Sequence, residues 1–378
     1  MTRLRRAGGA GSGTGPCTAR EAAAAVDGVL AEYLDARLQE AQETDAVFAR
    51  EVAGRVADFV RRGGKRLRTA FVWCGWRAAG GDGAAGTPLR IGAALELLQA
   101  CALIQDDVMD GSPLRRGAPA VHAEFARIHR NSRMSGSPES YSTAAAVLAG
   151  DLALAWADDL LADVALSTPH GPRLHREWQA MRTEMVAGQY LDMRAQATGS
   201  TAVDEARTIA ILKSARYTVE RPLALGASLA GADARTMEAL RAAGRGVGLA
   251  FQLRDDQLGA FGDPAVTGKP ADEDLRGRKL TYLLAVAVRL AGASNDRAAA
   301  LALSAHGLPR SDDQVARMRA ALERTGARAS VEAEIADLSA LSLRHFGASG
   351  ADQHARREFA SLVQSAVGNA PARSRENA

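Results

Sequence analysis

Two groups of aspartates have the residue types and the spacing that metal chemistry requires. The first is Asp-Asp-Val-Met-Asp over residues 106–110. In a helix, Asp106 and Asp110 share one face because they are four positions apart. The preceding turns, with Leu98 and Ile104, are too apolar for a fully solvated helix end, and carboxylates at a helix C-terminus oppose the helix dipole. We therefore expect a cation to hold these groups, and magnesium prefers such hard oxygen ligands.

The second group is Asp255 and Asp256, in Phe-Gln-Leu-Arg-Asp-Asp-Gln-Leu-Gly over residues 251–259. Carboxylates that project inward from facing helices are an established way to build metal sites in helical bundles. Magnesium takes only a few carboxylates and completes its coordination with phosphate and water. The predicted metal ligands are Asp106, Asp107, Asp110, Asp255 and Asp256. A diphosphate is the ligand predicted between the two groups.

Basic residues that could bind phosphate lie beside both groups. Gly-Gly-Lys-Arg-Leu-Arg over residues 63–68 opens a helix, where free backbone N–H groups also favour an anion. The other candidates are Arg115, Arg116, Lys213, Lys269 and Lys279. Each residue taken alone is more often a surface charge, so their joint placement carries the argument.

This set of motifs resembles the trans-isoprenyl diphosphate synthases, also called polyprenyl synthetases, and is most similar to a geranylgeranyl diphosphate synthase. The resemblance covers about residues 55–285. Besides the blocks above it rests on Glu96-Leu-Leu-Gln99, Arg115-Arg116-Gly117, Leu148-Ala-Gly150-Asp151, Gly188-Gln189-Tyr-Leu-Asp192, Lys213-Ser214 and Gly268-Lys269-Pro. It implies the all-α isoprenoid synthase type I fold, a single large helical bundle with a central active-site cavity.

The resemblance also implies an activity. Isopentenyl diphosphate would condense head-to-tail with an allylic diphosphate (dimethylallyl, geranyl or farnesyl), releasing diphosphate and giving an all-trans prenyl diphosphate. Magnesium and lysine would neutralise the leaving diphosphate as its C–O bond breaks. The double bond of isopentenyl diphosphate would then attack the allylic carbocation. We expect three magnesium ions per active site, bound with the diphosphate.

Roles for individual residues follow from the same resemblance. The residues expected to be catalytic are Asp106, Asp107, Asp110, Arg115, Lys213, Asp255 and Asp256. Those expected to contact the allylic diphosphate are Arg115, Lys213, Gln252, Lys269 and Lys279, and Ser214 is a further residue expected to bind substrate. Those expected to bind isopentenyl diphosphate are Lys65, Arg68, Gln99 and Arg116.

Three positions depart from the family pattern. Gln99 stands where the family usually has His, so a phosphate hydrogen bond is kept but a potential cation is lost. Ser214 replaces a usual Thr and keeps the hydroxyl. Gly259 stands where many members have a third Asp in the second group, and this loss could weaken one magnesium ion.

Two other classes of protein share part of this motif pattern. A class I terpene cyclase shares the fold and the first aspartate group, but it needs no second diphosphate site. Its metal motif has only a faint match at Asn295-Asp296, where Ala299 stands in place of Ser. A non-catalytic regulatory subunit tends to lose one aspartate group, and this chain keeps both.

Product length is predicted from the helix that bears Asp106. In the family, a bulky aromatic residue four or five positions before the first Asp stops growth at fifteen carbons. Here those positions hold Ala102 and Cys101, and the next candidates for a tunnel floor are Leu98 and Trp156. One further helical turn adds about 4.5 Å, so we expect the twenty-carbon product. Longer chains and farnesyl diphosphate are the alternatives.

The elements that must position these residues are helices. The apolar periodicity predicts helices over residues 22–60, 89–110, 144–166, 174–196, 204–214, 234–259, 281–290, 312–325 and 331–346. Strand patterns are almost absent. The segment 261–274, with two Gly and two Pro, is predicted to be a mobile flap over the site.

Composition limits the remaining possibilities. There are 47 Lys and Arg against 44 Asp and Glu, a net charge of +3, which does not argue for nucleic acid. The sequence shows neither a secretory signal nor a membrane span of the usual length, and the three Cys suggest free thiols. We expect a cytoplasmic protein with a flexible tail over 1–18, one catalytic domain over 19–368, a flexible tail over 369–378 and, by the resemblance, a homodimer.

Overall fold

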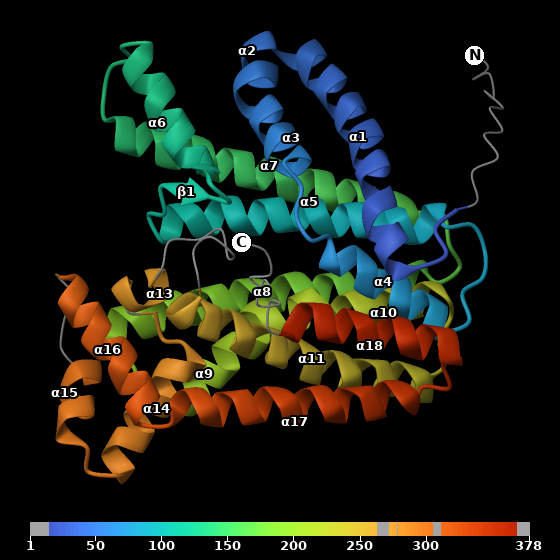
Figure 1. The fold of residues 1–378 in the computed structure, drawn as a ribbon. Helices are drawn as coiled ribbons and strands as arrows, with labels where there is room; N and C mark the ends of the chain where they lie inside the picture. Colours follow the sequence, from blue (N-terminus) through green and yellow to red (C-terminus); the bar gives the residue numbers. More distant parts are fainter. Residues whose placement is uncertain (1–14, 263–271, 278, 305–310, 369–378) are drawn as a thin grey trace, which may run out of the picture.

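The computed structural model describes residues 15–262, 272–277, 279–304 and 311–368. Almost every described segment is helical, so the predicted all-α fold is confirmed (Figure 1). The strands in this part of the chain are β1 (Leu114–Arg115) and β2 (Ala118–Pro119). They form a short antiparallel hairpin directly after the helix that carries Asp106.

The helices of the first half precede and follow this hairpin in the chain. They are α1 (Ala19–Thr44), α2 (Ala46–Phe48), η1 (Ala49–Ala53), α3 (Gly54–Arg61), α4 (Leu67–Ala78), α5 (Gly86–Met109), α6 (Val121–Asn131), α7 (Pro138–Leu166) and α8 (Gly171–Thr198).

The helices of the second half include the one that bears the second aspartate group. They are α9 (Val203–Ile209), η2 (Ala210–Glu220), α10 (Arg221–Leu229), α11 (Ala234–Phe261), α13 (Glu273–Arg276), α14 (Tyr282–Ala293), α15 (Arg297–Ser304), α16 (Asp312–Arg324), α17 (Ala327–Gly347) and α18 (Gln353–Val367).

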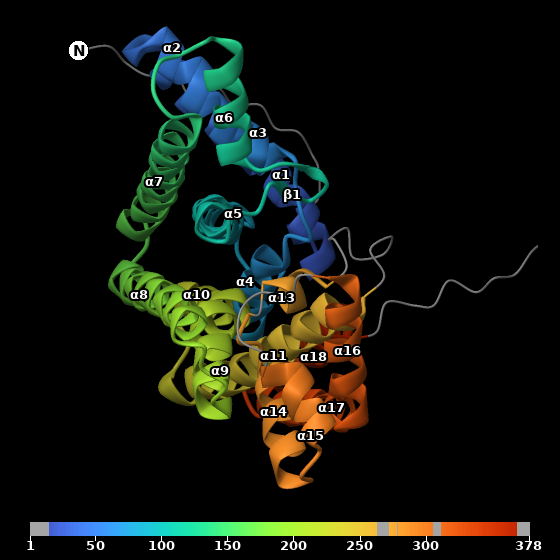
Figure 2. The same ribbon diagram turned by 90° about the vertical axis from the view of Figure 1, so that its left-hand side faces the viewer.

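Helix α5 lies inside the bundle. Figure 2 shows it end-on, with α1, α7, α8 and α11 around it. It packs most extensively against α7, whereas α11 packs against η2 and α17. Leu95, Leu97 and Leu98 of α5 are fully buried in one continuous apolar core. This burial explains why α5 is apolar on all sides rather than along one stripe.

Helix α5 is also long and apolar enough to cross a membrane when judged by length and composition alone. This differs from the expectation that no segment would come near a membrane span. However, 72% of its apolar window is buried inside the fold. The hydrophobicity of α5 is therefore accounted for by the protein core.

The single helix predicted over residues 22–60 is wrong, because the chain breaks at Asp45. This residue is extended (φ −165°, ψ 132°), and its side chain accepts a hydrogen bond from the backbone N–H of Phe48. An aspartate in this position caps a new helix, so the apolar periodicity continues while the helix axis does not.

Helix α1 begins at Ala19 with a capping box. The Thr18 hydroxyl accepts from the N–H of Glu21, and the Glu21 carboxylate accepts from the N–H of Thr18. At the other end of the chain, α18 ends at Val367. The predicted tails fall mainly on residues 1–14 and 369–378, which lie outside the described residues, and the domain boundaries stay a prediction.

Candidate active site

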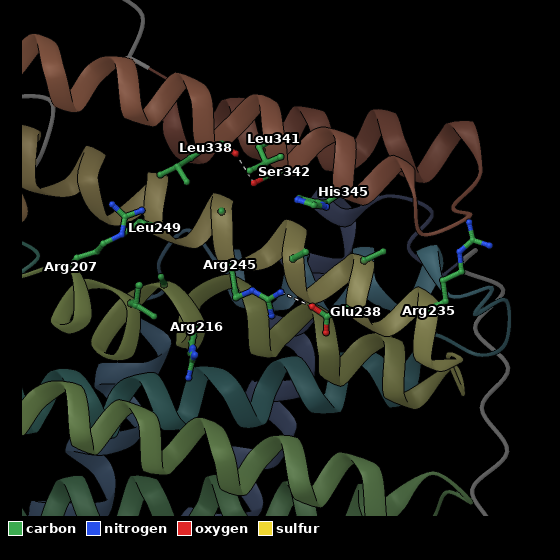
Figure 3. Close-up of a pocket in the computed structure, with 15 residues that line it drawn as sticks. Arg207, Arg216, Arg235, Glu238, Arg245, Leu249, Leu338, Leu341, Ser342 and His345 are labelled. Carbon is green, nitrogen blue, oxygen red and sulfur yellow. Dashed lines mark hydrogen bonds and ion pairs between the residues drawn. The ribbon is translucent and has the colours of Figure 1, made fainter. Parts of the chain in front are cut away.

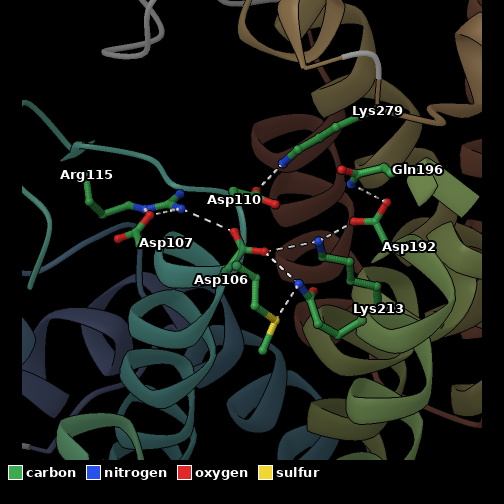
Figure 4. Close-up of polar contacts among 10 residues, drawn as sticks. Asp106, Asp107, Asp110, Arg115, Asp192, Gln196, Lys213 and Lys279 are labelled. Carbon is green, nitrogen blue, oxygen red and sulfur yellow. Dashed lines mark hydrogen bonds and ion pairs between the residues drawn. The ribbon is translucent and has the colours of Figure 1, made fainter. Parts of the chain in front are cut away.

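Asp106, in the last turns of α5, is the most connected residue of the predicted site (Figure 4). Its Oδ1 lies 3.1 Å from Lys213 Nζ and 3.2 Å from Gln189 Nε2, and its Oδ2 lies 3.2 Å from an Arg115 guanidinium nitrogen. Burial alone would raise the pKa of Asp106. The charges of Lys213, Lys279 and Arg115 outweigh burial and lower that pKa, so the carboxylate stays ionised.

Lys213 is held between two acidic side chains from different helices. It lies on η2, a π-helical segment, and its Nζ is 2.6 Å from Asp192 of α8 as well as 3.1 Å from Asp106. A Cβ at Gly188 of α8 would lie only 2.6 Å from the Lys213 Cα. Gly188 is therefore the residue that lets η2 approach α8 closely enough for Lys213 to reach α5.

Lys279 connects the two aspartate groups. Its Nζ lies 2.5 Å from Asp110 Oδ2, although it follows the second group in the chain. Two residues later the chain turns into α14, where the backbone N–H of Tyr282 donates to Asp256 Oδ2 at 3.1 Å. Gln252 Nε2 donates to the other oxygen of Asp256 at 2.7 Å. These contacts place the end of α11 opposite the end of α5.

Within each aspartate pair, the two side chains have different surroundings. Asp107 is fully buried, and its Oδ1 accepts a hydrogen bond from Arg115 Nε at 2.8 Å. In Figure 4, Asp107 and the two lysines lie on opposite sides of Asp106. Asp256 is also buried, and burial raises its pKa to about 7, with further contributions from Asp274 and Asp255. Both carboxylates are thus buried, whereas Asp107 Oδ2 has no hydrogen-bond partner among the described residues.

Asp106, Asp110 and Asp255 are the carboxylates whose chemistry fits magnesium. All three are partly exposed and offer hard oxygen atoms. In the described part of the chain, no three Asp, Glu, His or Cys side chains converge into a metal-binding group. This donor set agrees with magnesium, which takes its remaining ligands from phosphate and water.

A second group of basic residues comprises Arg116, Arg68 and Lys65, and it is distinct from the group of Arg115, Lys213 and Lys279 described above. Arg116 follows Arg115 and folds over the Gly63–Gly64 turn, where its guanidinium donates to the Gly63 carbonyl. A Cβ at Gly64 would lie 3.0 Å from the same guanidinium. Burial lowers the pKa of Arg116, and the positive charges of Arg66, Arg115 and Arg68 lower it further, although Glu96 opposes them. Such crowding of cations favours the binding of an anion.

The other residues predicted to bind isopentenyl diphosphate are placed around this group. Arg68 donates to the Thr218 hydroxyl at 3.1 Å and stacks over the Tyr217 ring. Lys65 is exposed, and Gln99 has a buried Oε1 without a hydrogen-bond partner among the described residues. Arg66 is different because it is buried and pairs with Glu96 at 2.9 Å, so it supports the turn from inside.

Sequence reasoning assigned no role to Gln189 and Asp192, which the structure brings to Asp106 and Lys213. Both were visible in the motif Gly188-Gln189-Tyr-Leu-Asp192, and their i, i+3 spacing places them on one face of α8. Ser214 lies beside Lys213 on η2 and is partly buried. Lys269 and residues 263–271 of the predicted flap over 261–274 lie outside the described residues, so the flap stays a prediction.

The residues expected to set product length lie in the core between α5 and α7. Leu98 and Cys101 are almost fully buried, and Trp156 is 6% exposed. Burial raises the pKa of the Cys101 thiol to about 12. The Trp156 carbonyl accepts from the Tyr33 hydroxyl at 2.9 Å, which fixes α7 against α1. Ala102, one position further, is partly buried.

A cavity of about 810 Å³ lies elsewhere, between η2, α11 and α17 (Figure 3). None of the predicted site residues lines it. Several of its arginines are already paired with glutamates, including Arg207 with Glu334 and Arg245 with Glu238. This cavity is therefore distinct from the aspartate site.

Comparison with known proteins now decides the family. The sequence profile of the family described as polyprenyl synthetase matches residues 50–322. This chain belongs to the polyprenyl synthetase family. The chain is 36% identical to a (2E,6E)-farnesyl diphosphate synthase of Mycobacterium tuberculosis, over 72% of this chain and 70% of that protein. It is 35% identical to a geranylgeranyl diphosphate synthase of the same organism, over 60% of this chain and 59% of that protein.

Solved structures agree with this family. A crystal structure of a geranylgeranyl pyrophosphate synthase from Corynebacterium glutamicum, complexed with isoprenyl diphosphate and magnesium, is 36% identical and superposes with a TM-score of 0.87. The match covers 92% of this chain and 99% of that chain. This polyprenyl synthetase thus has the isoprenoid synthase type I fold and trans-prenyl diphosphate synthase activity, and the family depends on magnesium in general.

Proposed function

We propose that this synthase condenses isopentenyl diphosphate with a dimethylallyl, geranyl or farnesyl primer and makes chiefly geranylgeranyl diphosphate. The observation that carries the proposal is the ion-pair chain from Asp192 through Lys213 to Asp106, together with the Lys279–Asp110 pair. It supplies carboxylates for magnesium and lysines for phosphate at one place, while Arg116 contacts the Gly63 carbonyl and Arg68 stacks over Tyr217.

The lysines have a direct role in this proposal. In the structure Lys213 pairs with Asp106 and Lys279 pairs with Asp110, and both carboxylates are only partly exposed. Asp106, Asp110 and Asp255 would hold magnesium together with the allylic diphosphate, and Lys213, Lys279 and Arg115 would neutralise the phosphate oxygens. Bound magnesium supplies positive charge that stabilises the leaving diphosphate. We propose three ions per site.

Isopentenyl diphosphate binds at the second basic group. Arg116, Arg68 and Lys65 neutralise its diphosphate, and Gln99 donates an amide hydrogen bond. Only the Nε2 amide of Gln99 can donate to a diphosphate; its buried Oε1, which has no partner among the described residues, can only accept. The side chains position and neutralise the substrates, and none of them acts as a nucleophile.

The twenty-carbon product is supported by the residues one to two turns before Asp106. Cys101 and Ala102 are too small to stop a growing chain, whereas Leu98 and Trp156 are large and buried. Relatives of both product classes have nearly equal identity to this chain, so their names do not decide the length. Farnesyl diphosphate and longer chains are the competing products.

We also propose a cytoplasmic homodimer that uses α7 and α8. Both helices expose large apolar side chains, including Leu148 at 62%, Val186 at 63% and Tyr190 at 64%. Such exposure on neighbouring helices is typical of a surface that another subunit covers. Sedimentation of the pure protein at micromolar concentration should give the mass of two chains. A mass near one chain would contradict the dimer.

The product assignment is tested by incubating the pure protein with labelled isopentenyl diphosphate and each primer in turn, then sizing the dephosphorylated products. The expected result is a twenty-carbon alcohol from every accepted primer. A fifteen-carbon product that is not extended further would establish a farnesyl diphosphate synthase. Much longer products would show that the tunnel continues past Leu98 and Trp156.

A further inference from the structure

Arg66 stands between two residues that are proposed to bind isopentenyl diphosphate, but its side chain is turned into the protein. Lys65 is exposed and Arg68 is partly buried, whereas Arg66 is only 7% exposed. All three cations belong to one short segment, the residues that lead into α4 and its first turn. Burial removes Arg66 from the substrate, so its charge acts within the protein.

The backbone of Arg66 adopts the left-handed conformation, with φ 47° and ψ 33°. A Cβ makes this conformation unfavourable, and glycine is the residue that adopts it without strain. A residue with a side chain stays in this conformation only where its surroundings fix it. Because Arg66 directly precedes α4, its conformation sets the direction in which the chain leaves the Gly63–Gly64 turn and enters that helix.

The Arg66 guanidinium fixes this conformation by bonding to three helices at once. Its Nε lies 2.9 Å from Asp27 Oδ1 of α1, and one terminal nitrogen lies 2.9 Å from Glu96 Oε2 of α5. The other terminal nitrogen donates to the Val60 carbonyl of α3 at 2.9 Å. Glu96 is 6% exposed, so its ion pair with Arg66 forms inside the protein. A lysine presents one nitrogen atom and does not match this planar fork of donors.

Glu96 ties the turn to the part of α5 that carries Gln99. The two residues are three positions apart, so they lie on one face of α5. The proposed ligands of isopentenyl diphosphate come from two segments, since Lys65 and Arg68 belong to the segment that opens α4 and Gln99 belongs to α5. The Arg66–Glu96 ion pair, at 2.9 Å, is a direct bond between these two segments.

We propose that Arg66 is a positioning residue for isopentenyl diphosphate, and that its bond to Glu96 sets the spacing between the substrate-binding cations and Gln99. This inference rests on the proposed function, because it assumes that Lys65, Arg68 and Gln99 bind that substrate. Arg66 itself touches no substrate, since its guanidinium is buried and bonds to protein groups. Its loss should therefore weaken binding of isopentenyl diphosphate and spare the allylic diphosphate, whose ligands lie at the aspartate groups.

The test measures binding in a variant that removes the ion pair and keeps the turn. Arg66→Gly alone would leave Glu96 buried without a counter-charge, so it is combined with Glu96→Gln. Glycine adopts the left-handed conformation without strain, so the backbone of the turn is still favoured in this double variant. Equilibrium dialysis with labelled isopentenyl diphosphate, which does not react without an allylic primer, gives the dissociation constant. Dialysis with magnesium and a labelled, unreactive thiolo analogue of an allylic diphosphate gives the reference.

We expect the double variant to bind isopentenyl diphosphate roughly 10-fold more weakly than wild type, the effect of misplacing a hydrogen bond to a charged group. Binding of the thiolo analogue should equal wild type. Equal binding of isopentenyl diphosphate by the variant and wild type would overturn the proposal, because the unstrained turn alone would then suffice. Equal losses for both ligands would also overturn it, because Arg66 would then support the whole protein and not one substrate site.

Arg62→Gln combined with Glu124→Gln is the matched control. Arg62 lies four residues before Arg66 and pairs with Glu124 of α6 at 2.8 Å. This variant loses an ion pair of the same type and should bind isopentenyl diphosphate like wild type; weakening equal to that of the Arg66 variant would overturn the proposal. Arg68→Ala tests the proposed function itself. If it binds isopentenyl diphosphate as well as wild type, the proposed function of the second basic group and this inference both fail. If Arg68→Ala binds weakly and the Arg66 variant binds normally, only this inference fails.

Discussion

Lys279 Nζ lies 2.5 Å from Asp110 Oδ2, and this ion pair joins the end of α5 to the segment that follows α11. The two residues are far apart in sequence: Asp110 ends the first aspartate group, whereas Lys279 follows the second group in the chain. Because Tyr282, three positions after Lys279, also bonds to Asp256, the segment is tied to both groups. This segment thus joins both halves of the bundle at the site.

Loss of Asp106 should nearly abolish activity. Asp106→Ala removes the carboxylate that contacts Lys213, Gln189 and Arg115, so we expect turnover to fall by about 10²–10³-fold, the usual effect of removing one contact to developing charge. Steady-state kinetics with saturating magnesium measures this. The control is Asp35→Ala, which removes an exposed partner of Arg61 and should leave turnover unchanged. Wild-type turnover in Asp106→Ala would contradict the mechanism.

Much of this site could be anticipated from the sequence because it is built from short blocks with helical spacing. Asp106 and Asp110, four residues apart, had to share a face of α5. Arg115, Lys213 and Lys279 were candidates for phosphate binding by their joint placement, the resemblance assigned them to the allylic diphosphate, and the structure brings all three to these aspartates. The contacts themselves depend on helix packing, which spacing along one helix does not describe.

Other features could not be predicted for identifiable reasons. The break at Asp45 was missed because the apolar periodicity continues through it. Helix α10 was missed because nearly all of it is buried and it therefore has no amphipathic pattern. The close approach of the Asp274 carboxylate to Gly259 was missed because it arises from a turn that Arg319 of α16 holds through Asp272. Tertiary contacts decide each of these features.

Gly188→Ala should impair the site without touching a substrate. The new methyl group would collide with the backbone of Lys213, and displacement of a catalytic group by about 1 Å can cost about 10²-fold in rate. The same assay measures the loss. Gly28→Ala is the matched control, because a Cβ at Gly28 meets nothing within 4 Å and the helix should gain roughly 0.5–1 kcal/mol of stability. Equal activity in both variants would refute the role of Gly188.

Gln99→His should strengthen binding of isopentenyl diphosphate. A charged donor forms a stronger hydrogen bond than a neutral one, by about 1 kcal/mol, so the KM for this substrate should fall about fivefold. The decrease in KM should be largest below about pH 6.5, where the new histidine is protonated. It should become smaller as the pH rises above that value. The KM for the allylic primer serves as the internal control. An unchanged or higher KM for isopentenyl diphosphate at low pH would contradict the assigned contact.

The tunnel assignment predicts opposite effects at two positions. Cys101→Phe places a bulky ring in the core one turn before Asp106 and should shorten the main product to fifteen carbons. Trp156→Ala removes a large buried side chain from α7 and should lengthen it. Product sizing by chromatography measures both. An unchanged product distribution in Cys101→Phe would show that the chain does not grow along this face of α5.

Thiol reactivity tests the packing of the core around Cys101. Cys17 is exposed, whereas Cys74 and Cys101 are buried, and the pKa of Cys101 is raised to about 12. Because the thiolate is the reactive form, the native protein at pH 8 should show one fast thiol with an aromatic disulfide reagent and three after denaturation. Cys17→Ser should show none before denaturation. Any fast thiol in native Cys17→Ser would contradict this packing.

The central claim is tested most directly by counting diphosphate release against isopentenyl incorporation in one reaction. The pure protein is supplied with labelled isopentenyl diphosphate, an allylic primer and magnesium, and both quantities are followed over time. The account predicts one diphosphate released for each isopentenyl unit incorporated, and neither event in excess chelator. Diphosphate release from the allylic primer without incorporation of label, or incorporation that continues in chelator, would contradict it.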